Sequence, residues 1–296
     1  MELCLFLGCN TPAIRPDVER AIRASMPELG VDLVDAEGYV CCPAFGAFPS
    51  TDDESHLASS AWNLSIAESK GLDLIVECGS CYSSLTMGLD HLSQDKTTLA
   101  RVNELLELTG RQLECNTRVR HISEVLYNEV GCEKIAATIK KNLKGLHGVV
   151  QYPCHTLFPS ELVGFEASPR QPKILAELTG ALGADIDHFS LEMQCCGGAG
   201  GFKNNSPDEA MQFTREKLDA IINETRADFI VVSCITCLMH LDTVQKQLND
   251  SLGVDRYAIP VFDYNQLLAL CMDFDSKEVA SICQTDRQPV IQRLQR

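Results

Sequence analysis

Basic residues are in the minority in this sequence. Lys and Arg number 25 against 41 Asp and Glu, which gives the 296-residue chain a formal net charge of −16. Nucleic-acid phosphates and anionic membrane surfaces repel a protein of this charge, so non-specific binding to either is disfavoured. We therefore expect no nucleic-acid partner. An anionic substrate would need a local basic group on an otherwise acidic surface.

Long apolar runs and a secretory signal are also missing. No stretch approaches the ~18 apolar residues of a transmembrane helix. The N-terminal segment MELCLFLGCN is apolar, but it has neither the basic segment nor the small-residue cleavage site that a secretory signal carries. We therefore expect a cytoplasmic protein with no direct membrane insertion.

Two common cofactor motifs do not occur. No G-x-G-x-x-G sequence follows a predicted strand, which disfavours a dinucleotide-binding loop. No C-x-x-C-x-x-C-x-x-x-C run of the ferredoxin type is present. Clusters of that type are therefore expected on a separate protein chain, if this chain exchanges electrons with them.

Cysteine, in contrast, is abundant: the chain has 15, and ten of them form a doubled series. Each series reads Cys, a long gap, Cys-Cys, another long gap and Cys-x-x-Cys. An odd count, adjacent pairs and Cys-x-x-Cys spacings indicate metal binding rather than disulfides, which a reducing cytosol disfavours. The two series are Cys9, Cys41, Cys42, Cys78 and Cys81, and Cys154, Cys195, Cys196, Cys234 and Cys237.

The segments around the cysteines repeat too. Each half opens with a strand-like run, LCLFLGC or GVVQYPC, and continues into a predicted helix between Pro and Gly, at 16–30 and 169–183. Further helices are predicted to begin at capping boxes in TDDE and SPDE. The apolar runs LDLIV and ADFIVV lead directly into the two Cys-x-x-Cys motifs.

Strands that alternate with helices predict an α/β fold with parallel pairing. We expect two pseudo-symmetric repeats of a parallel-sheet β-α-β unit, with the cysteines near the carboxyl ends of strands, where ligands collect in such sheets. The predicted division is a first repeat at 1–94, a helical connector at 95–148, and a second repeat with a C-terminal helical extension at 149–296.

Thiolates are soft ligands that select zinc or iron–sulfur clusters. A structural zinc takes four ligands, often from two Cys-x-x-Cys motifs, whereas each half here offers five cysteines and one such motif. Adjacent cysteines point apart and suit a larger cluster better than one small ion. The glycines after the second pair can bring backbone N–H groups to the sulfurs. These are Gly197, Gly198, Gly200 and Gly201. Structural zinc in one half stays an alternative.

A few residues outside the cysteine series are candidates for substrate contacts. His155 could orient a substrate or donate a proton, and a structural histidine is an equal alternative. Lys203 could bind an anionic group, or it could be an ordinary solvated lysine. Weaker candidates for the same role are Arg15, Arg170 and Lys173. Cys4 and Cys271 lie in apolar runs and are expected in the core.

With these motifs, the sequence resembles the cysteine-rich CCG-domain proteins, and most closely the B-type subunits of heterodisulfide reductases. FLGCN, YVCCPAFGAF and ECGSCY resemble the first half of that family, and QYPCH, QCCGGAGG and VSCITC the second. The resemblance covers nearly the whole chain. It implies one noncubane [4Fe-4S] cluster on each five-cysteine series.

The resemblance also implies an activity and partners. The enzyme would be an oxidoreductase that reduces the mixed disulfide of coenzyme M and coenzyme B, between its clusters, to two thiols in two one-electron steps. The clusters themselves would be catalytic, with His155 as an additional candidate. Implied partners are the ferredoxin-like C-type and the flavin-containing A-type subunits of heterodisulfide reductase, of which only the latter holds FAD, in an electron-bifurcating complex of methanogenesis. Hydrogenase or formate dehydrogenase modules could supply electrons.

One departure from the motif and two rival functions remain. Pro43, not glycine, follows the first cysteine pair, so the hydrogen bonds around the first cluster should differ. One rival is a CCG-domain electron-transfer subunit of another anaerobic oxidoreductase, which acts on a different disulfide or relays electrons. The other is a non-enzymatic scaffold of two zinc-bound halves.

Overall fold

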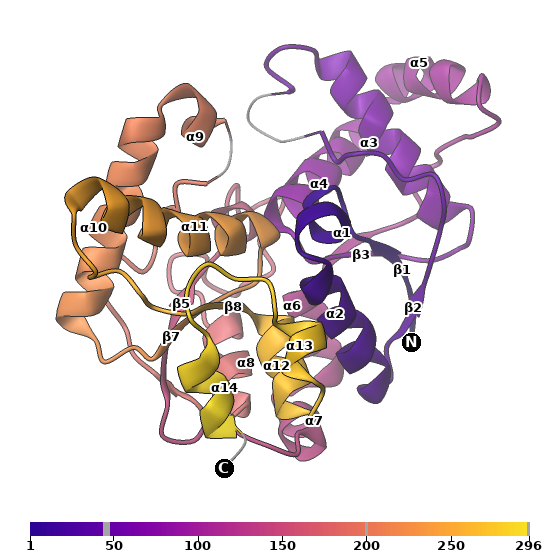
Figure 1. The fold of residues 1–296 in the computed structure, drawn as a ribbon. Coiled ribbons are helices and arrows are strands. Elements are labelled where there is room, and N and C mark those ends of the chain that lie inside the picture. Colours follow the sequence, from indigo (N-terminus) through magenta and orange to yellow (C-terminus); the bar gives the residue numbers. More distant parts are fainter. Residues whose placement is uncertain (44–47, 199–200, 295–296) are drawn as a thin grey trace.

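The structure, a computed structural model, describes residues 1–43, 48–198 and 201–294 (Figure 1). It contains two four-stranded parallel sheets, with strand orders β2-β1-β3-β4 and β6-β5-β7-β8. The matching orders confirm the predicted α/β fold of two pseudo-symmetric repeats. The first sheet has β1 (Glu2–Phe6), β2 (Asp32–Val34), β3 (Leu74–Val76) and β4 (Val119–His121), and the second β5 (His147–Gln151), β6 (Asp185–Ile186), β7 (Phe229–Val232) and β8 (Val261–Asp263).

The central strands are apolar along their whole length. All residues of β3 and β7 are buried, as expected for parallel strands that are covered on both faces. The helices of the first half are α1 (Asn10–Ile14), α2 (Pro16–Glu28), α3 (Asp53–Glu68), α4 (Gly79–Gln94), α5 (Lys96–Glu107), α6 (Ile122–Val125), the π-helical η1 (Leu126–Val130) and α7 (Cys132–Thr138). Those of the second are the 3-10 helix η2 (Cys154–Thr156), α8 (Ile174–Ala181), α9 (Phe202–Asn205), α10 (Pro207–Glu224), α11 (Ile235–Leu252), α12 (Tyr264–Cys271), α13 (Ser276–Val279) and α14 (Gln288–Leu294).

Two helix starts differ from the prediction. Helix α8 begins at Ile174 rather than near residue 169, because the carboxylate of Glu166 accepts hydrogen bonds from the backbone N–H groups of Lys173 and Ile174. Helix α3 has Asp52 as its N-cap, and the Asp52 side chain accepts from Ser55 N at 3.0 Å. Aspartate is as good an N-cap as threonine, so the start moves by one residue from the predicted box.

The segment 95–148 is not purely helical. Its residues Val119–His121 form β4, which pairs in parallel with β3 and completes the first sheet. All three residues of β4 are buried. The sequence analysis missed this strand because it is short and directly followed by helix. The division of the chain at residues 94 and 148 stays a prediction.

The C-terminal helices tie the two halves together. Helix α12, which follows the last strand of the second sheet, packs against α2 of the first half, and both lie side by side in Figure 1. At the equivalent position of the first half, α6 and η1 contact α8 of the second half. Each half thus covers a helix of the other.

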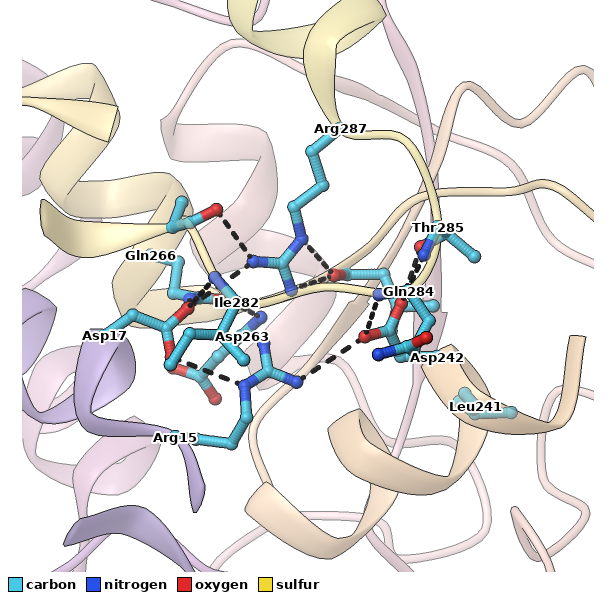
Figure 2. Close-up of polar contacts among 12 residues, drawn as sticks. Arg15, Asp17, Leu241, Asp242, Asp263, Gln266, Ile282, Gln284, Thr285 and Arg287 are labelled. Carbon is cyan, nitrogen blue, oxygen red and sulfur yellow. Dashed lines mark hydrogen bonds and ion pairs between the residues drawn. The ribbon is translucent and has the colours of Figure 1, made fainter. Parts of the chain in front are cut away.

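A buried ion network stabilises this junction (Figure 2). Asp17 on α2 contacts the guanidinium groups of Arg15, at 3.3 Å, and Arg287, at 3.7 Å. Arg15 also contacts Asp242 on α11 at 3.7 Å. Gln266 on α12 donates to Asp17 at 2.7 Å. The network therefore joins the first half, the second half and the C-terminal segment.

Candidate metal centre

The ten predicted cysteines lie where strands end. In each half, the first cysteine follows the opening strand and the Cys-x-x-Cys motif follows the central strand, with its second cysteine in the first turn of a helix. The Cys-Cys pairs lie in the loops before α3 and α9. The carboxyl ends of neighbouring parallel strands share one edge of a sheet, and this brings residues far apart in the sequence together.

In the first half, the thiols form a connected array. The Cys41 Sγ atom lies 3.9 Å from Cys9 Sγ. Cys42 interacts with both Cys41 and Cys81, and Cys81 interacts with Cys78. All five cysteines of the first series are therefore in one group.

The second half repeats this array, and the two arrays meet. Cys195 interacts with Cys154 and with Cys196, which in turn contacts the Cys-x-x-Cys motif through Cys237. Cys237 interacts with Cys234. The Sγ atoms of Cys78 and Cys234 lie 3.8 Å apart and join the halves. The sequence indicated two separate sets; the structure makes them neighbours.

A cavity of about 270 Å³ lies at this junction. The cysteines of the first series line one side of it. Gly198, Asn204, Ile235 and Thr236 of the second half line the other side. A small molecule in this cavity would therefore contact both halves.

The thiols differ in acidity because they hydrogen-bond to one another. A hydrogen bond from Cys41 lowers the pKa of Cys42 to about 5, and one from Cys154 lowers the pKa of Cys195 to about 2. The pKa of Cys78 is also well below its ordinary value, chiefly because Cys234 hydrogen-bonds to it. Each half thus provides thiolate character, the form that binds metals.

This donor set fits iron–sulfur chemistry. The ten thiols form an extended array of soft donors. Six of them are buried: Cys42, Cys78, Cys81, Cys196, Cys234 and Cys237. Within the described ranges, no three His, Cys, Asp or Glu side chains are grouped as a site for one metal ion. Soft thiolate donors suit zinc and iron–sulfur clusters, so the donor chemistry matches the prediction.

The glycines after the second cysteine pair are required by close packing. Gly197 has a φ of +88°, and Gly198 lies so close to His240 that a Cβ atom there would be 2.7 Å from His240 Cβ. The N–H groups of Gly197 and Gly198 point to Cys195 Sγ and Cys196 Sγ at 3.3 and 3.4 Å. These contacts agree with the predicted N–H···S bonds. Gly201 starts α9, and Gly200 lies outside the described residues.

The first pair is held differently. Pro43 has no N–H group, so it cannot donate to a cysteine sulfur. Its carbonyl oxygen instead accepts a hydrogen bond from Ser84 Oγ at 2.6 Å. The predicted difference between the two hydrogen-bond environments is therefore present in the fold.

The other candidate residues have different fates. His155 is half-buried beside Cys154, and burial lowers its pKa. Lys203 is exposed on the short helix α9, where its neighbours Gly201 and Asn204 line the cavity. Neither is among the described residues that line the cavity, so their roles stay predictions. The prediction that Arg15 could bind an anionic substrate is wrong. Arg15 is 3% exposed, and its guanidinium group forms ion pairs in the buried network.

Sequence analysis missed two buried charged residues near the cysteines. Glu77 precedes Cys78 and is 3% exposed, and burial and the nearby Asp263 raise its pKa well above the ordinary value. Lys217 on α10 is 1% exposed. A charged residue within an apolar run or on the apolar face of a helix was the available signal for both.

Comparison with known proteins supports the site. The family model for the CCG cysteine-rich domain matches residues 3–86 and 149–242. The chain belongs to this family. The two matched ranges contain all ten cysteines of the doubled series. A crystal structure of a hypothetical protein from Helicobacter pylori shares the fold, with a TM-score of 0.74 and 14% identity, over 94% of this chain and 50% of that chain.

Curated relatives extend the match to nearly the full chain. A protein of Archaeoglobus profundus that is described as like the B-type subunit of heterodisulfide reductase is 40% identical over 98% of this chain and 97% of its own length. The B-type subunit of a ferredoxin/F(420)H(2)-dependent CoB-CoM heterodisulfide reductase of Methanosarcina acetivorans is 35% identical over 94% of this chain and 91% of its own. The predicted resemblance to the B-type subunits of heterodisulfide reductases is confirmed, and it indicates a redox protein.

A third relative has a different role. The 8-methylmenaquinol:fumarate reductase membrane anchor subunit of Wolinella succinogenes is 30% identical over 94% of both chains. In the part of the present chain that the structure describes, no helix combines the length and the hydrophobicity needed to cross a membrane.

Proposed function

We propose that this protein is the catalytic subunit of a heterodisulfide reductase that binds two noncubane [4Fe-4S] clusters. The ligands of the first cluster would be Cys9, Cys41, Cys42, Cys78 and Cys81, and those of the second Cys154, Cys195, Cys196, Cys234 and Cys237. The reaction converts one disulfide, two electrons and two protons into two thiols. The proposed substrate is the mixed disulfide of coenzyme M and coenzyme B.

One observation carries this proposal: the two cysteine arrays meet at Cys78 and Cys234, 3.8 Å apart, beside a cavity that both halves line. A disulfide has two sulfur atoms and needs two electrons, so two adjacent one-electron centres match its chemistry. When bound, the clusters would supply the electrons and a binding site for sulfur.

The residues of the chain would hold and enclose the substrate. Asn204 and Thr236 present polar side chains at the cavity, and Ile235 presents an apolar one. His155 is proposed to contact the substrate or donate a proton, and Lys203 to bind an anionic group at the cavity rim. Proposed partners are the ferredoxin-like C-type and the flavin-containing A-type subunits, the latter with FAD, in an electron-bifurcating complex fed by hydrogenase or formate dehydrogenase modules.

The metal content of anaerobically purified protein tests the proposal first. Two four-iron clusters require about eight irons and eight acid-labile sulfides per chain, with no zinc. About four irons with one zinc would leave one cluster and contradict the two-cluster mechanism. Zinc alone would overturn any redox role.

The alternative function is that of an electron-transfer subunit of another anaerobic oxidoreductase, which acts on a different disulfide or relays electrons. The similarity to a subunit of a fumarate reductase favours this alternative. An anaerobic assay with reduced viologen dye separates the two functions. We expect the mixed disulfide of coenzyme M and coenzyme B to oxidise the dye in the presence of the protein. A protein with full iron that reacts with no disulfide, yet passes electrons to an acceptor, would be a relay.

Replacement of Lys203 by Ala tests substrate binding. Lys203 is exposed beside two cavity-lining residues, so loss of its charge should raise KM for an anionic disulfide by about tenfold and change kcat little. Steady-state kinetics at low salt measure both constants. Lys246→Ala, an exposed lysine on α11, is the matched control. An unchanged KM would show that Lys203 does not bind the substrate and is an ordinary solvated lysine.

A further inference from the structure

Helices α3 and α10 are equivalent elements of the two repeats. Each is the first long helix after the Cys-Cys pair of its half, with Asp52 and Ser206 as N-cap residues. In the second half the short helix α9 lies between the pair and α10. Several buried positions correspond: Ser60 to Thr214, and Leu64 to Leu218. The residue eleven positions after the N-cap is also buried in both helices, and it is one of the positions at which the repeats differ.

In the first half this residue is Asn63, with no exposed surface. Its Oδ1 atom accepts a hydrogen bond from Val40 N at 2.9 Å, and its Nδ2 atom donates to Cys41 O at 3.5 Å. A neutral amide therefore holds the loop that carries the first cysteine pair.

In the second half the same position is Lys217, 1% exposed. Its Nζ atom donates to Leu191 O at 2.8 Å and to Glu192 O at 3.3 Å, just before the second cysteine pair. The ammonium also lies 5.3 Å from the centre of the Phe189 ring. An ammonium group therefore holds the second loop where an amide holds the first.

A buried ammonium needs a compensating negative charge. Transfer of an isolated cation from water to a protein interior costs several kcal/mol. Among the described residues, Lys217 forms no ion pair with a carboxylate. Burial lowers the pKa of Lys217 to about 8, and the charges of Cys196, Cys237, Cys195 and Glu192 act in the opposite direction. The negative charge that compensates this cation thus comes chiefly from the second cysteine array, with a smaller contribution from Glu192.

The backbone around the two cysteine pairs also differs, and this difference favours negative charge at the second site, as Lys217 does. Gly197 and Gly198 direct N–H groups at Cys195 Sγ and Cys196 Sγ, whereas Pro43, which follows the first pair, has no N–H. Positive charge and N–H···S hydrogen bonds both favour the reduced, more negative state of an iron–sulfur cluster, and so raise its reduction potential.

We propose that the two cluster sites are electrically unequal, and that Lys217 makes the reduction potential of the second site more positive than that of the first. Lys217 is a positioning residue in this role, because it acts on the cluster through its charge. This inference rests on the proposed function, since it requires two clusters.

A redox titration of the holoprotein with dithionite, followed by EPR and visible absorption, tests the inference. Wild type should titrate in two steps. In Lys217→Met the more positive step should move to a more negative potential while the other step stays. Lys217→Arg should restore the wild-type value, and Lys246→Met, which removes an exposed charge screened by water, should change neither step. If Lys217→Met keeps its full iron content and both of its reduction potentials equal those of the wild type, the inference is overturned.

A second measurement covers the case in which Lys217→Met does not fold. The cluster that remains in Cys42→Ala, in which the first site is broken, should titrate at the more positive potential. The cluster that remains in Cys196→Ala should titrate at the more negative one. The reverse order would overturn the inference and leave the proposed function intact. A wild-type protein without two clusters would instead remove the proposed function itself.

Discussion

Cys196→Ala is expected to lose about half of the bound iron and all measurable disulfide reduction. Cys196 is 3% exposed and lies between Cys195 and Cys237 in the second thiol array. Its removal leaves a gap that no neighbouring thiol fills, so the second cluster should not assemble. In the proposed mechanism each sulfur of the substrate is served by its own one-electron centre, so the remaining cluster should not complete the reaction.

Iron and sulfide analysis, EPR and the dye-linked disulfide assay measure these losses. Cys132→Ala is the matched control, because Cys132 is a half-buried thiol at the start of α7, outside both series. It should keep its full iron content and activity. Disulfide reduction by a Cys196→Ala protein that has lost its second cluster would contradict the two-cluster mechanism.

Asp17→Ala is expected to reduce the free energy of unfolding by about 3–5 kcal/mol, the usual cost of breaking a buried ion pair. Asp17 is 2% exposed, and its removal leaves the guanidinium groups of Arg15 and Arg287 without this carboxylate. Burial lowers the pKa of Arg287 to about 10, so the group is still charged at neutral pH. The backbone N–H of Ile282 would also lose its acceptor, and Gln266 would lose one of the two hydrogen bonds that its Nε2 atom donates.

Chemical unfolding followed by circular dichroism under anaerobic conditions measures this loss. Asp35→Ala is the matched control, since Asp35 is an aspartate paired with Arg23 at 2.7 Å but with a side chain that is 69% exposed. Surface pairs contribute about 1 kcal/mol or less, so the control should change stability little. Equal effects of the two substitutions would contradict the assignment of Asp17 to the junction between the halves.

Much of the site could be predicted because it depends on short sequence motifs. The doubled cysteine series, the apolar runs before Cys78 and Cys234, and the glycines after Cys196 all depend on neighbours in the sequence. The predicted strands and the start of α10 at Pro207 follow from the same kind of signal. β4 was not found, because three residues are too few to show a period.

The sequence by itself determined the two repeats, the acidic surface charge and the presence of five thiols near strand ends in each half. Only the tertiary structure decided that Cys78 lies against Cys234, that Arg15 is buried beside Asp17, and that Lys217 occupies the place of Asn63. The physical reason is the range of the interactions. Periodicity and turn chemistry act between near neighbours, whereas the distance between residues of different halves depends on how the packed helices bring the two sheets together.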